Sequence, residues 1–106
     1  MRIELPFPPR VLSPNVRKHW ATKCKAKQDY SWAVAAALPK EIPEGIHLDI
    51  TFHPPSKRRF DLDNCLASLK PAIDILSKKW KIDDSIFTYT LRKGRQVKGG
   101  KVVINV

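Results

Sequence analysis

The sequence predicts one α/β domain whose elements follow one another as strand, helix, strand, helix and two further strands. Three observations support this prediction. Apolar and polar residues alternate over residues 46–53, which is the period of a half-buried strand. Apolar residues recur at steps of three and four over residues 63–80, which is the period of a helix with one buried side. The chain has 106 residues, a length typical of a single domain.

A first strand is expected over residues 2–7, because apolar side chains alternate there with charged ones. Prolines end this strand, and residues 8–15 form a proline-rich loop. Ser13 or Asn15 can then cap a helix that we expect from about Val16 to Leu38. The apolar members of this helix are expected to be Trp20, Cys24, Ser31 or Trp32, Val34 or Ala35, and Leu38.

The second strand and the second helix carry the clearest core patterns. Alternate positions of residues 46–53 are expected to face the core, namely Ile46, Leu48, Ile50 and Phe52. A helix from Asp63 to Trp80 presents an apolar stripe made of Leu66, Leu69, Ile73, Leu76 and Trp80. Pro71 lies in the middle of that helix, where it removes a backbone hydrogen bond, so we expect a kink there.

The C-terminal part reads as two strands. Residues 85–93 alternate and follow directly after Asp83 and Asp84, and KVVINV ends the chain. The polar connection GRQVKGG between them predicts that the two strands pair as an antiparallel hairpin.

Composition restricts the class of function. Lys and Arg number 20 against 10 acidic residues, which gives a formal net charge of +10. This balance favours a polyanionic partner such as nucleic acid; a solvated basic surface or an acidic protein partner are the alternatives. No apolar run approaches the roughly 20 residues of a membrane span, and the N-terminus has no export signal, so a cytoplasmic protein is expected.

Cysteine and histidine give no metal-binding pattern. Cys24 and Cys65 lack CxxC spacing, and we expect two small half-buried thiols without a disulfide. The three histidines are scattered along the chain. Any metal would therefore be held by oxygen ligands.

Basic residues gather in three stretches. In the first half of the first helix only Asp29 stands among the lysines, so pairing along the helix does not explain them. A phosphate-contacting surface and a solvated helix face are the two interpretations. The predicted DNA-binding residues are Arg17, Lys18, Lys23, Lys25, Lys27, Lys57, Arg58, Arg59, Arg95 and Lys98.

Residues 57–84 hold five of the ten acidic residues of this basic chain. Asp61 and Asp63, two positions apart in an extended segment, would point to the same side and could share a divalent cation. Mg²⁺ prefers carboxylate oxygens and completes its shell with substrate phosphate, which suits a phosphodiesterase. Lys70, about two helical turns after Asp63, could orient a water or stabilise developing negative charge.

Purely structural roles are the alternative for each of these residues. Asp63 can cap the helix, Asp83 and Asp84 can form a turn, and Asp74 can pair with Lys70 or Lys78. A straight helix from Asp63 to Trp80 would be on the order of 25 Å long and would hold Asp84 far from Asp61. Either the kink and the following tail bring the chain back, or a second subunit completes the site.

The segment DLDNCLASLKPAIDILSKKWKIDDS resembles the motif of the RusA-type Holliday junction resolvases, which reads DxDN, a downstream Lys, DxL and then DD. The N-terminal LPFPPRVLSPNVRKHW is similar to the opening PxPPS…N…W of that family. Together the matches cover most of the chain. Members of the family are small homodimeric Mg²⁺-dependent endonucleases carried by bacteria and their phages.

The resemblance implies a set of site residues. Asp61, Asp63 and one of Asp83 and Asp84, with Asp84 favoured, would hold the catalytic Mg²⁺, for which Mn²⁺ is a possible substitute. Lys70 would be the catalytic lysine. Asn15, Asn64 and Asp74 match further motif positions.

The resemblance also implies the fold and the function. Residues 1–106 would form a single RusA-like domain in β-α-β-α-β-β order, with a small mixed sheet of about four strands and two main helices. Two such domains would form a homodimer on a four-way DNA junction and resolve it in recombination and repair. The alternatives are a non-catalytic nucleic-acid-binding module and a nuclease for other branched DNA, such as flaps or forks.

Overall fold

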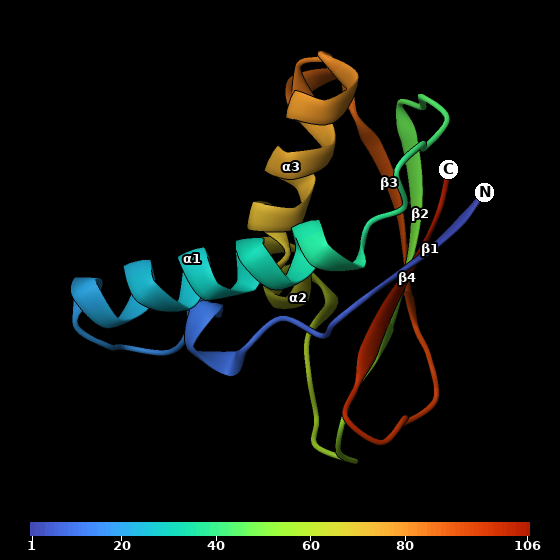
Figure 1. The fold of residues 1–106 in the computed structure, drawn as a ribbon. Coiled ribbons are helices and arrows are strands. Elements are labelled where there is room, and N and C mark those ends of the chain that lie inside the picture. Colours follow the sequence, from blue (N-terminus) through green and yellow to red (C-terminus); the bar gives the residue numbers. More distant parts are fainter.

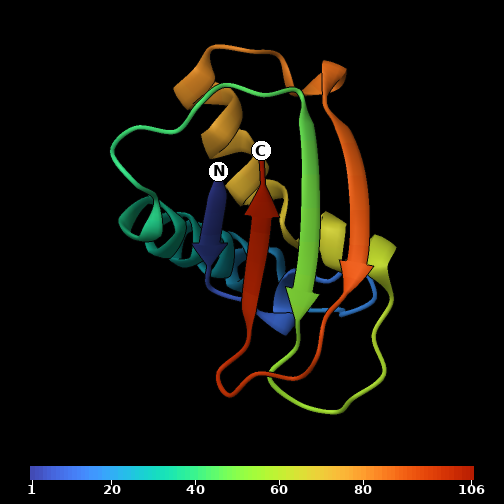
Figure 2. The ribbon, with the colours of Figure 1, turned by 90° about the vertical axis from the view of Figure 1, so that its right-hand side faces the viewer.

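Four strands form one mixed sheet in the computed structural model of the protein, which describes residues 1–106. The helices cover one face of this sheet, and the other face is open (Figures 1 and 2). With η marking a 3-10 helix, the elements are β1 (Arg2–Leu5), η1 (Arg10–Leu12), α1 (Trp20–Ala37), β2 (His47–His53), α2 (Leu62–Ser68), α3 (Lys70–Trp80), η2 (Asp84–Ile86), β3 (Thr88–Lys93) and β4 (Lys101–Asn105). The predicted α/β class and mixed sheet are confirmed.

The strand order is β1-β4-β2-β3, so the predicted hairpin between the last two strands is wrong. β4 pairs antiparallel with both β1 and β2, while β3 pairs in parallel with β2. Burial explains why β4, and not β3, lies in the interior of the sheet. Three consecutive residues of β4 are buried, Val102, Val103 and Ile104, whereas no residue of β3 is fully buried. The strand that is apolar on both sides takes a central position, and the more polar strand takes the edge.

The parallel pairing of β2 and β3 follows from what lies between them. Parallel strands need a long crossover, usually helical, and α2 and α3 supply it. In the register, Ile50 of β2 lies opposite Leu91 of β3 and opposite Ile104 of β4. The crossover therefore brings the residues just before α2 and just after α3 to the two ends of β3.

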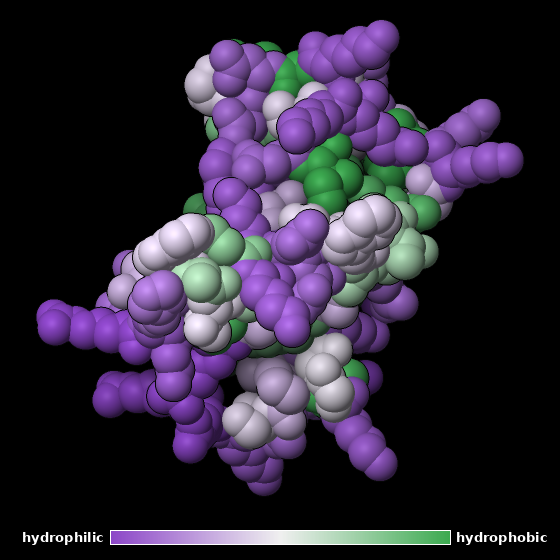
Figure 3. Space-filling view, turned by 60° about the vertical axis from the view of Figure 1, so that its left-hand side comes forward, coloured by the Kyte–Doolittle hydropathy of each residue, from purple (hydrophilic) through white to green (hydrophobic).

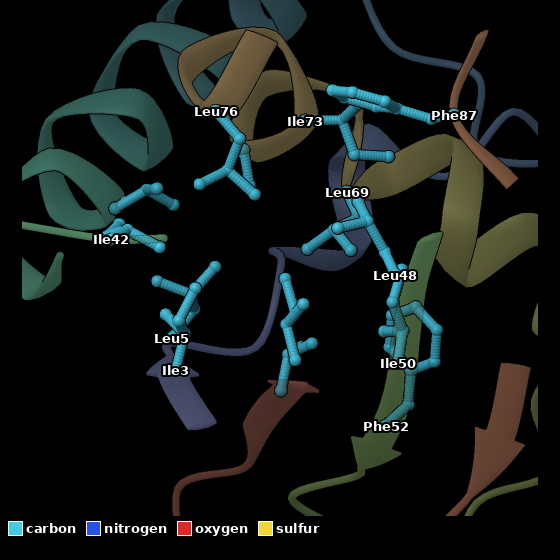
Figure 4. Close-up of a cluster of buried hydrophobic side chains, with 14 of the residues drawn as sticks. Ile3, Leu5, Ile42, Leu48, Ile50, Phe52, Leu69, Ile73, Leu76 and Phe87 are labelled. Atoms are coloured by element: carbon cyan, nitrogen blue, oxygen red, sulfur yellow. The ribbon is translucent and has the colours of Figure 1, made fainter. Parts of the chain in front are cut away.

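The core lies between the helices and the covered face of the sheet. Figure 4 shows side chains of β1 and β2 pointing toward those of α3, with Leu48, Ile50 and Phe52 fully enclosed. Each buried aliphatic or aromatic side chain of this kind stabilises the fold by roughly 1.5–3 kcal/mol. The prediction for β2 is confirmed except at Ile46, which is 52% exposed because β2 begins one residue after it.

Helix α1 differs most from expectation. It begins at Trp20 rather than Val16, because His19 is its N-cap and accepts the Ala21 N–H through Nδ1 at 3.2 Å. Only Tyr30 and Val34 are buried, and the first half of the helix projects beyond the other helices (Figure 1). Trp20 and Trp32 are therefore both 71% exposed, so the interpretation that would place them in the core is wrong, and the alternatives weighed for them stay open.

The predicted long second helix is two helices. Leu69 stands between α2 and α3, and its N–H still bonds to the Cys65 carbonyl at 3.0 Å. Pro71 lies in the first turn of α3, where no intrahelical N–H is needed, so the chain restarts a helix there instead of kinking one. The apolar stripe is confirmed for Leu69 through Trp80, while Leu66 is half-buried.

Two element boundaries also shift at the strands. β1 ends at Leu5 because Pro6 cannot continue the ladder, and β3 begins at Thr88 because residues 84–86 form η2. None of the helices has the length and apolar character that a membrane span requires.

Candidate active site

Asp61 and Asp63 lie at the start of α2, and we call this pair the α2 cluster. Asp61 is the residue before the helix, in extended conformation, and Asp63 belongs to the first helical turn. The expectation that both lie on one extended segment is therefore wrong, because the helix begins at Leu62. Neither carboxylate takes part in an ion pair, and Asp61 only accepts a long hydrogen bond of 3.4 Å from the Asn64 side chain.

Lys70, the first residue of α3, contacts two carboxylates, and we call Lys70, Asp74 and Asp84 the α3 cluster. Its Nζ lies 3.0 Å from an oxygen of Asp74 one helical turn on. The same nitrogen donates a hydrogen bond to a carboxylate oxygen of Asp84, which comes from η2. These two carboxylates, Asp84 above all, hold the pKa of Lys70 well above its usual range.

Asp84 returns to α3 through a reversal at the end of that helix. Lys81 adopts a left-handed conformation with φ of 56°, which ends α3. Ser77 then holds the segment after α3 through two hydrogen bonds to Ile82. The Ser77 carbonyl accepts the Ile82 N–H at 3.1 Å, and the Ser77 hydroxyl donates to the Ile82 carbonyl at 2.5 Å. The contact of Asp84 with Lys70 thus forms within one chain.

Asp83 and Asp84 do different things despite being adjacent. The carboxylate of Asp83 is the N-cap of η2 and accepts the Ser85 N–H at 2.9 Å, and this hydrogen bond lowers the pKa of Asp83. Asp84 points to Lys70 instead. The turn-forming role weighed for Asp83 is confirmed, and Asp84 is the member of the pair that joins a motif residue.

The two clusters do not merge into one ligand group. No three side chains of His, Cys, Asp or Glu come close enough together to hold a metal ion. Carboxylate oxygens are the ligands that Mg²⁺ prefers, so the donor chemistry fits that ion, while the grouping of Asp61, Asp63, Asp83 and Asp84 within one chain does not. Their role as metal ligands stays a prediction.

Three residues near the clusters were not identified from the sequence. Tyr89 of β3 is half-buried, and its pKa is raised by burial with a smaller contribution from the charge of Asp84. The ammonium of Lys93 lies 5.0 Å from the centre of the Phe60 ring. Phe60 directly precedes Asp61, whereas Tyr89 and Lys93 reach this region only through the parallel placement of β3 beside the crossover, which no local sequence pattern predicts.

Cys65 lies in α2, two residues after Asp63, and is buried, whereas Cys24 is exposed, so the expectation of two half-buried thiols is wrong. Both are free, as expected. Burial raises the pKa of the Cys65 thiol to about 11; among the nearby charges, Lys93 lowers it and Asp61 and Asp63 raise it. Cys65 is therefore an unreactive thiol at neutral pH.

Two of the predicted DNA-binding stretches meet at one end of the sheet. The loop after β3 bonds to the loop after β2, where the Val97 N–H donates to the Pro54 carbonyl at 3.0 Å and the Gln96 side chain to the Pro55 carbonyl at 3.3 Å. This brings together the stretches that contain Lys57, Arg58, Arg59, Arg95 and Lys98, all of which are exposed.

The third stretch is separate from the other two. Arg17 and Lys18 precede α1, and Lys23, Lys25 and Lys27 lie on its projecting half. Viewed from the side of α1, the molecule shows mostly hydrophilic side chains projecting from its surface (Figure 3). Lys23 is half-buried, with its Nζ donating to the Ser13 carbonyl at 3.5 Å, and the other four are exposed.

A cavity of about 520 Å³ opens beside Asp61. Three segments line it: residues 7–16 of the N-terminal loop, residues 54–61 before α2, and one face of α2 at Asn64, Cys65 and Ser68. Arg10, Arg58 and Arg59 are among the lining residues. Arg10 was not among the residues predicted to bind DNA, since it stands alone between two prolines and a valine.

No protein-family model matches the chain. A bacterial protein named "Uncharacterized protein", from Xylella fastidiosa (strain Temecula1 / ATCC 700964), is 34% identical over 113 residues, which span 98% of this chain and 74% of that protein. The two chains belong to one family. Because the alignment covers nearly the whole chain, both carboxylate clusters and the cavity lie in the shared domain.

Proposed function

We propose that the protein is a metal-dependent, structure-selective endodeoxyribonuclease of the RusA type that resolves four-way DNA junctions as a homodimer. The observation that supports this most is the contact between Lys70 and Asp84. It joins two members of the resolvase-like motif that stand 14 positions apart. The α2 cluster, which carries the DxDN part of the motif, precedes this contact on the adjoining helix.

In this proposal Asp61, Asp63, Asp84 and Asp83 would supply the oxygen ligands for Mg²⁺ or Mn²⁺, although they do not form one group within the single chain. Such an ion, if these residues held it, would supply Lewis-acid chemistry toward a phosphate and a bound water. Lys70, with its raised pKa, stays protonated at neutral pH and brings a fixed positive charge near the phosphate that is cut. The exposed basic residues at the end of the sheet and on α1 hold the DNA backbone, so selectivity comes from the shape of the DNA.

The decisive test combines a binding and a cleavage assay on a labelled four-way junction. Wild-type protein with Mg²⁺ should nick the junction, and Asp63→Asn should lower the single-turnover rate by about 10³-fold or more, equivalent to several kcal/mol of lost stabilisation. Junction binding by the variant should persist or tighten, because one negative charge near phosphate is gone. Asp29→Asn, which removes an exposed acid of α1 outside both clusters, is the matched control and should cut normally.

A non-catalytic nucleic-acid-binding protein is the second candidate, and one observation favours it: no three side chains of His, Cys, Asp or Glu within the chain are grouped so that they could hold a metal ion. Wild-type protein that binds the junction tightly with Mg²⁺ or Mn²⁺ but leaves it intact would support this candidate and overturn the nuclease proposal. A panel with flaps and replication forks separates a resolvase from a nuclease for other branched DNA.

A further inference from the structure

We propose that the cavity beside Asp61 receives a single unstacked nucleotide of the DNA strand. The proposal rests on the proposed function, since it names a part of the substrate and the place that holds it. A volume of about 520 Å³ lies within the range of roughly 300–1,000 Å³ that is typical of pockets for one small molecule. Bases of an intact duplex are stacked and paired, so only a nucleotide that has left the stack can enter.

The walls of the cavity suit a base. The aromatic rings of Phe7 and Phe60 line it together with Val16. Phe7 is held in place by an edge-to-face contact with the core residue Phe52, with ring centres 6.2 Å apart. Aromatic faces are the usual platforms for unpaired bases, because every base has a π-face that can stack on them.

The basic residues that line the cavity suit a phosphate. Arg10 comes from the N-terminal loop, and Arg58 and Arg59 come from the loop before α2. None of the three takes part in an ion pair with a carboxylate. Guanidinium groups bind phosphate through two parallel hydrogen bonds, so three unpaired ones around a single opening favour an anionic ligand.

Both features together identify the ligand as a nucleotide within a strand. An inorganic phosphate would use the arginines and leave the aromatic walls without a partner. The side chains of Asn15 and Asn64 also line the cavity and offer amide groups to the edge of a base. Asp61 lines the same cavity, so a nucleotide held there places the neighbouring phosphodiester beside the α2 cluster.

The test compares two short DNA strands of equal length and charge, measured by fluorescence anisotropy with EDTA so that nothing is cut. One is a thymidine oligonucleotide, and the other has the same backbone with abasic residues. Wild-type protein should bind the strand with bases about tenfold more tightly, in line with stacking of one base on an aromatic ring. Equal affinity for the two strands overturns the proposal.

Variants locate the effect. Phe7→Leu keeps an apolar side chain against Phe52 and should remove most of the tenfold preference while leaving abasic binding unchanged. Arg10→Ala should weaken binding of both strands by a similar factor. Arg2→Ala is the matched control for Arg10→Ala, because it removes the same charge from a residue that pairs with Glu4 on β1, and it should leave the affinity for both strands unchanged. A preference that survives in Phe7→Leu contradicts the assignment.

Two further readouts keep the outcomes apart. If Phe7→Leu does not fold, amide NMR shifts of the wild-type protein with the thymidine oligonucleotide replace it; they should fall on residues 7–16 and 54–61, and shifts confined to α1 overturn the proposal. Cleavage of a junction with Mg²⁺ is measured in parallel. If the protein cuts the junction but shows no preference for the strand with bases, only the proposed nucleotide site is wrong. If it shows the preference but does not cut the junction, only the proposed nuclease activity is wrong.

Discussion

The α2 and α3 clusters are built from the same residue type, yet the fold treats them differently. In the α3 cluster, Asp74 and Asp84 share the ammonium group of Lys70. In the α2 cluster, Asp61 and Asp63 have no cationic partner, although the chain carries a net charge of +10. The unpaired carboxylates are therefore the ones that gain most from a cation supplied from outside the chain.

The pairing in the α3 cluster adds little to the stability of the fold. The side chain of Lys70 is 53% exposed, and those of Asp74 and Asp84 are 38% and 27% exposed. Ion pairs as exposed as these contribute about 1 kcal/mol or less to folding. The contact holds Asp84, which follows the chain reversal, against Lys70 at the start of α3. Helix α3 directly follows the helix that carries the α2 cluster.

Removal of Lys70 is the change that tests this difference most strongly. For Lys70→Ala we expect junction cleavage to fall by about 10²–10³-fold, as for the loss of one group that stabilises developing charge, with a much smaller change in affinity. The free energy of unfolding should change by about 1 kcal/mol or less. Single-turnover rates, junction titrations and urea denaturation measure the three quantities.

Lys78→Ala is the matched control, since Lys78 is an exposed lysine of the same helix that makes no ion pair, and it should cut at the wild-type rate. The raised pKa of Lys70 keeps its ammonium charged from neutral pH to about pH 9, and its small stabilisation disappears only above the usual lysine pKa of about 10.4. The Lys70→Ala defect should therefore be constant over that range. A defect in affinity as large as the defect in rate would make Lys70 a phosphate-binding residue instead.

The buried thiol of Cys65 gives a second, smaller test. A pKa of about 11 leaves Cys65 almost entirely protonated at pH 8, and burial blocks access to it, so alkylation by iodoacetamide should be about 100-fold slower or more than in the unfolded chain. The exposed Cys24 should react rapidly in the folded protein. Peptide mass spectrometry after timed quenching follows both residues. Equal rates at Cys24 and Cys65 would show that the thiol of Cys65 is not buried in the folded protein.

Features of the fold that depend on residues close together in the sequence were predicted, and features that depend on distant residues were not. The burial of Ile3 and Leu5, or of Leu48, Ile50 and Phe52, depends on a period of two within one strand, and the sequence displays it directly. The pairing of β3 is non-local. A hairpin is the local solution for two neighbouring strands, but the burial of β4 on both sides places it in the centre and sends β3 to the edge.

The candidate site shows the same limit. The resemblance placed Lys70 and Asp84 in one site with Asp61 and Asp63. The structure brings Lys70 and Asp84 into contact through the reversal at Lys81, and it does not gather the four aspartates into one group. The cavity with Phe7 and Arg10 joins three segments that no spacing rule connects. The exposed Trp20 and Trp32 illustrate the opposite error, because helical periodicity assigns a side to each residue and does not say how far the helix extends beyond its neighbours.

The smallest predicted effect on cleavage is that of a substitution at Pro71, which lies between the two clusters in the sequence. The break in the crossover lies at Leu69, before Pro71, and Pro71 occupies a first-turn position that needs no N–H. Pro71→Ala should therefore leave α2 and α3 separate and change cleavage by no more than about twofold. It should lower the free energy of unfolding by about 1–2 kcal/mol, because the unfolded chain gains entropy and a buried ring loses packed carbons.

Pro14→Ala separates these two contributions, since Pro14 is exposed and its replacement by Ala leaves only the entropic part, about 0.4–1 kcal/mol. Urea denaturation gives both values, and the difference between them is the packing contribution of the Pro71 ring. Should Pro71→Ala reduce cleavage as much as Lys70→Ala does, the proline rather than Leu69 would be what holds Lys70 against Asp84. The independence of the two clusters would then have to be abandoned, because a single residue between them would control the geometry of the α3 cluster.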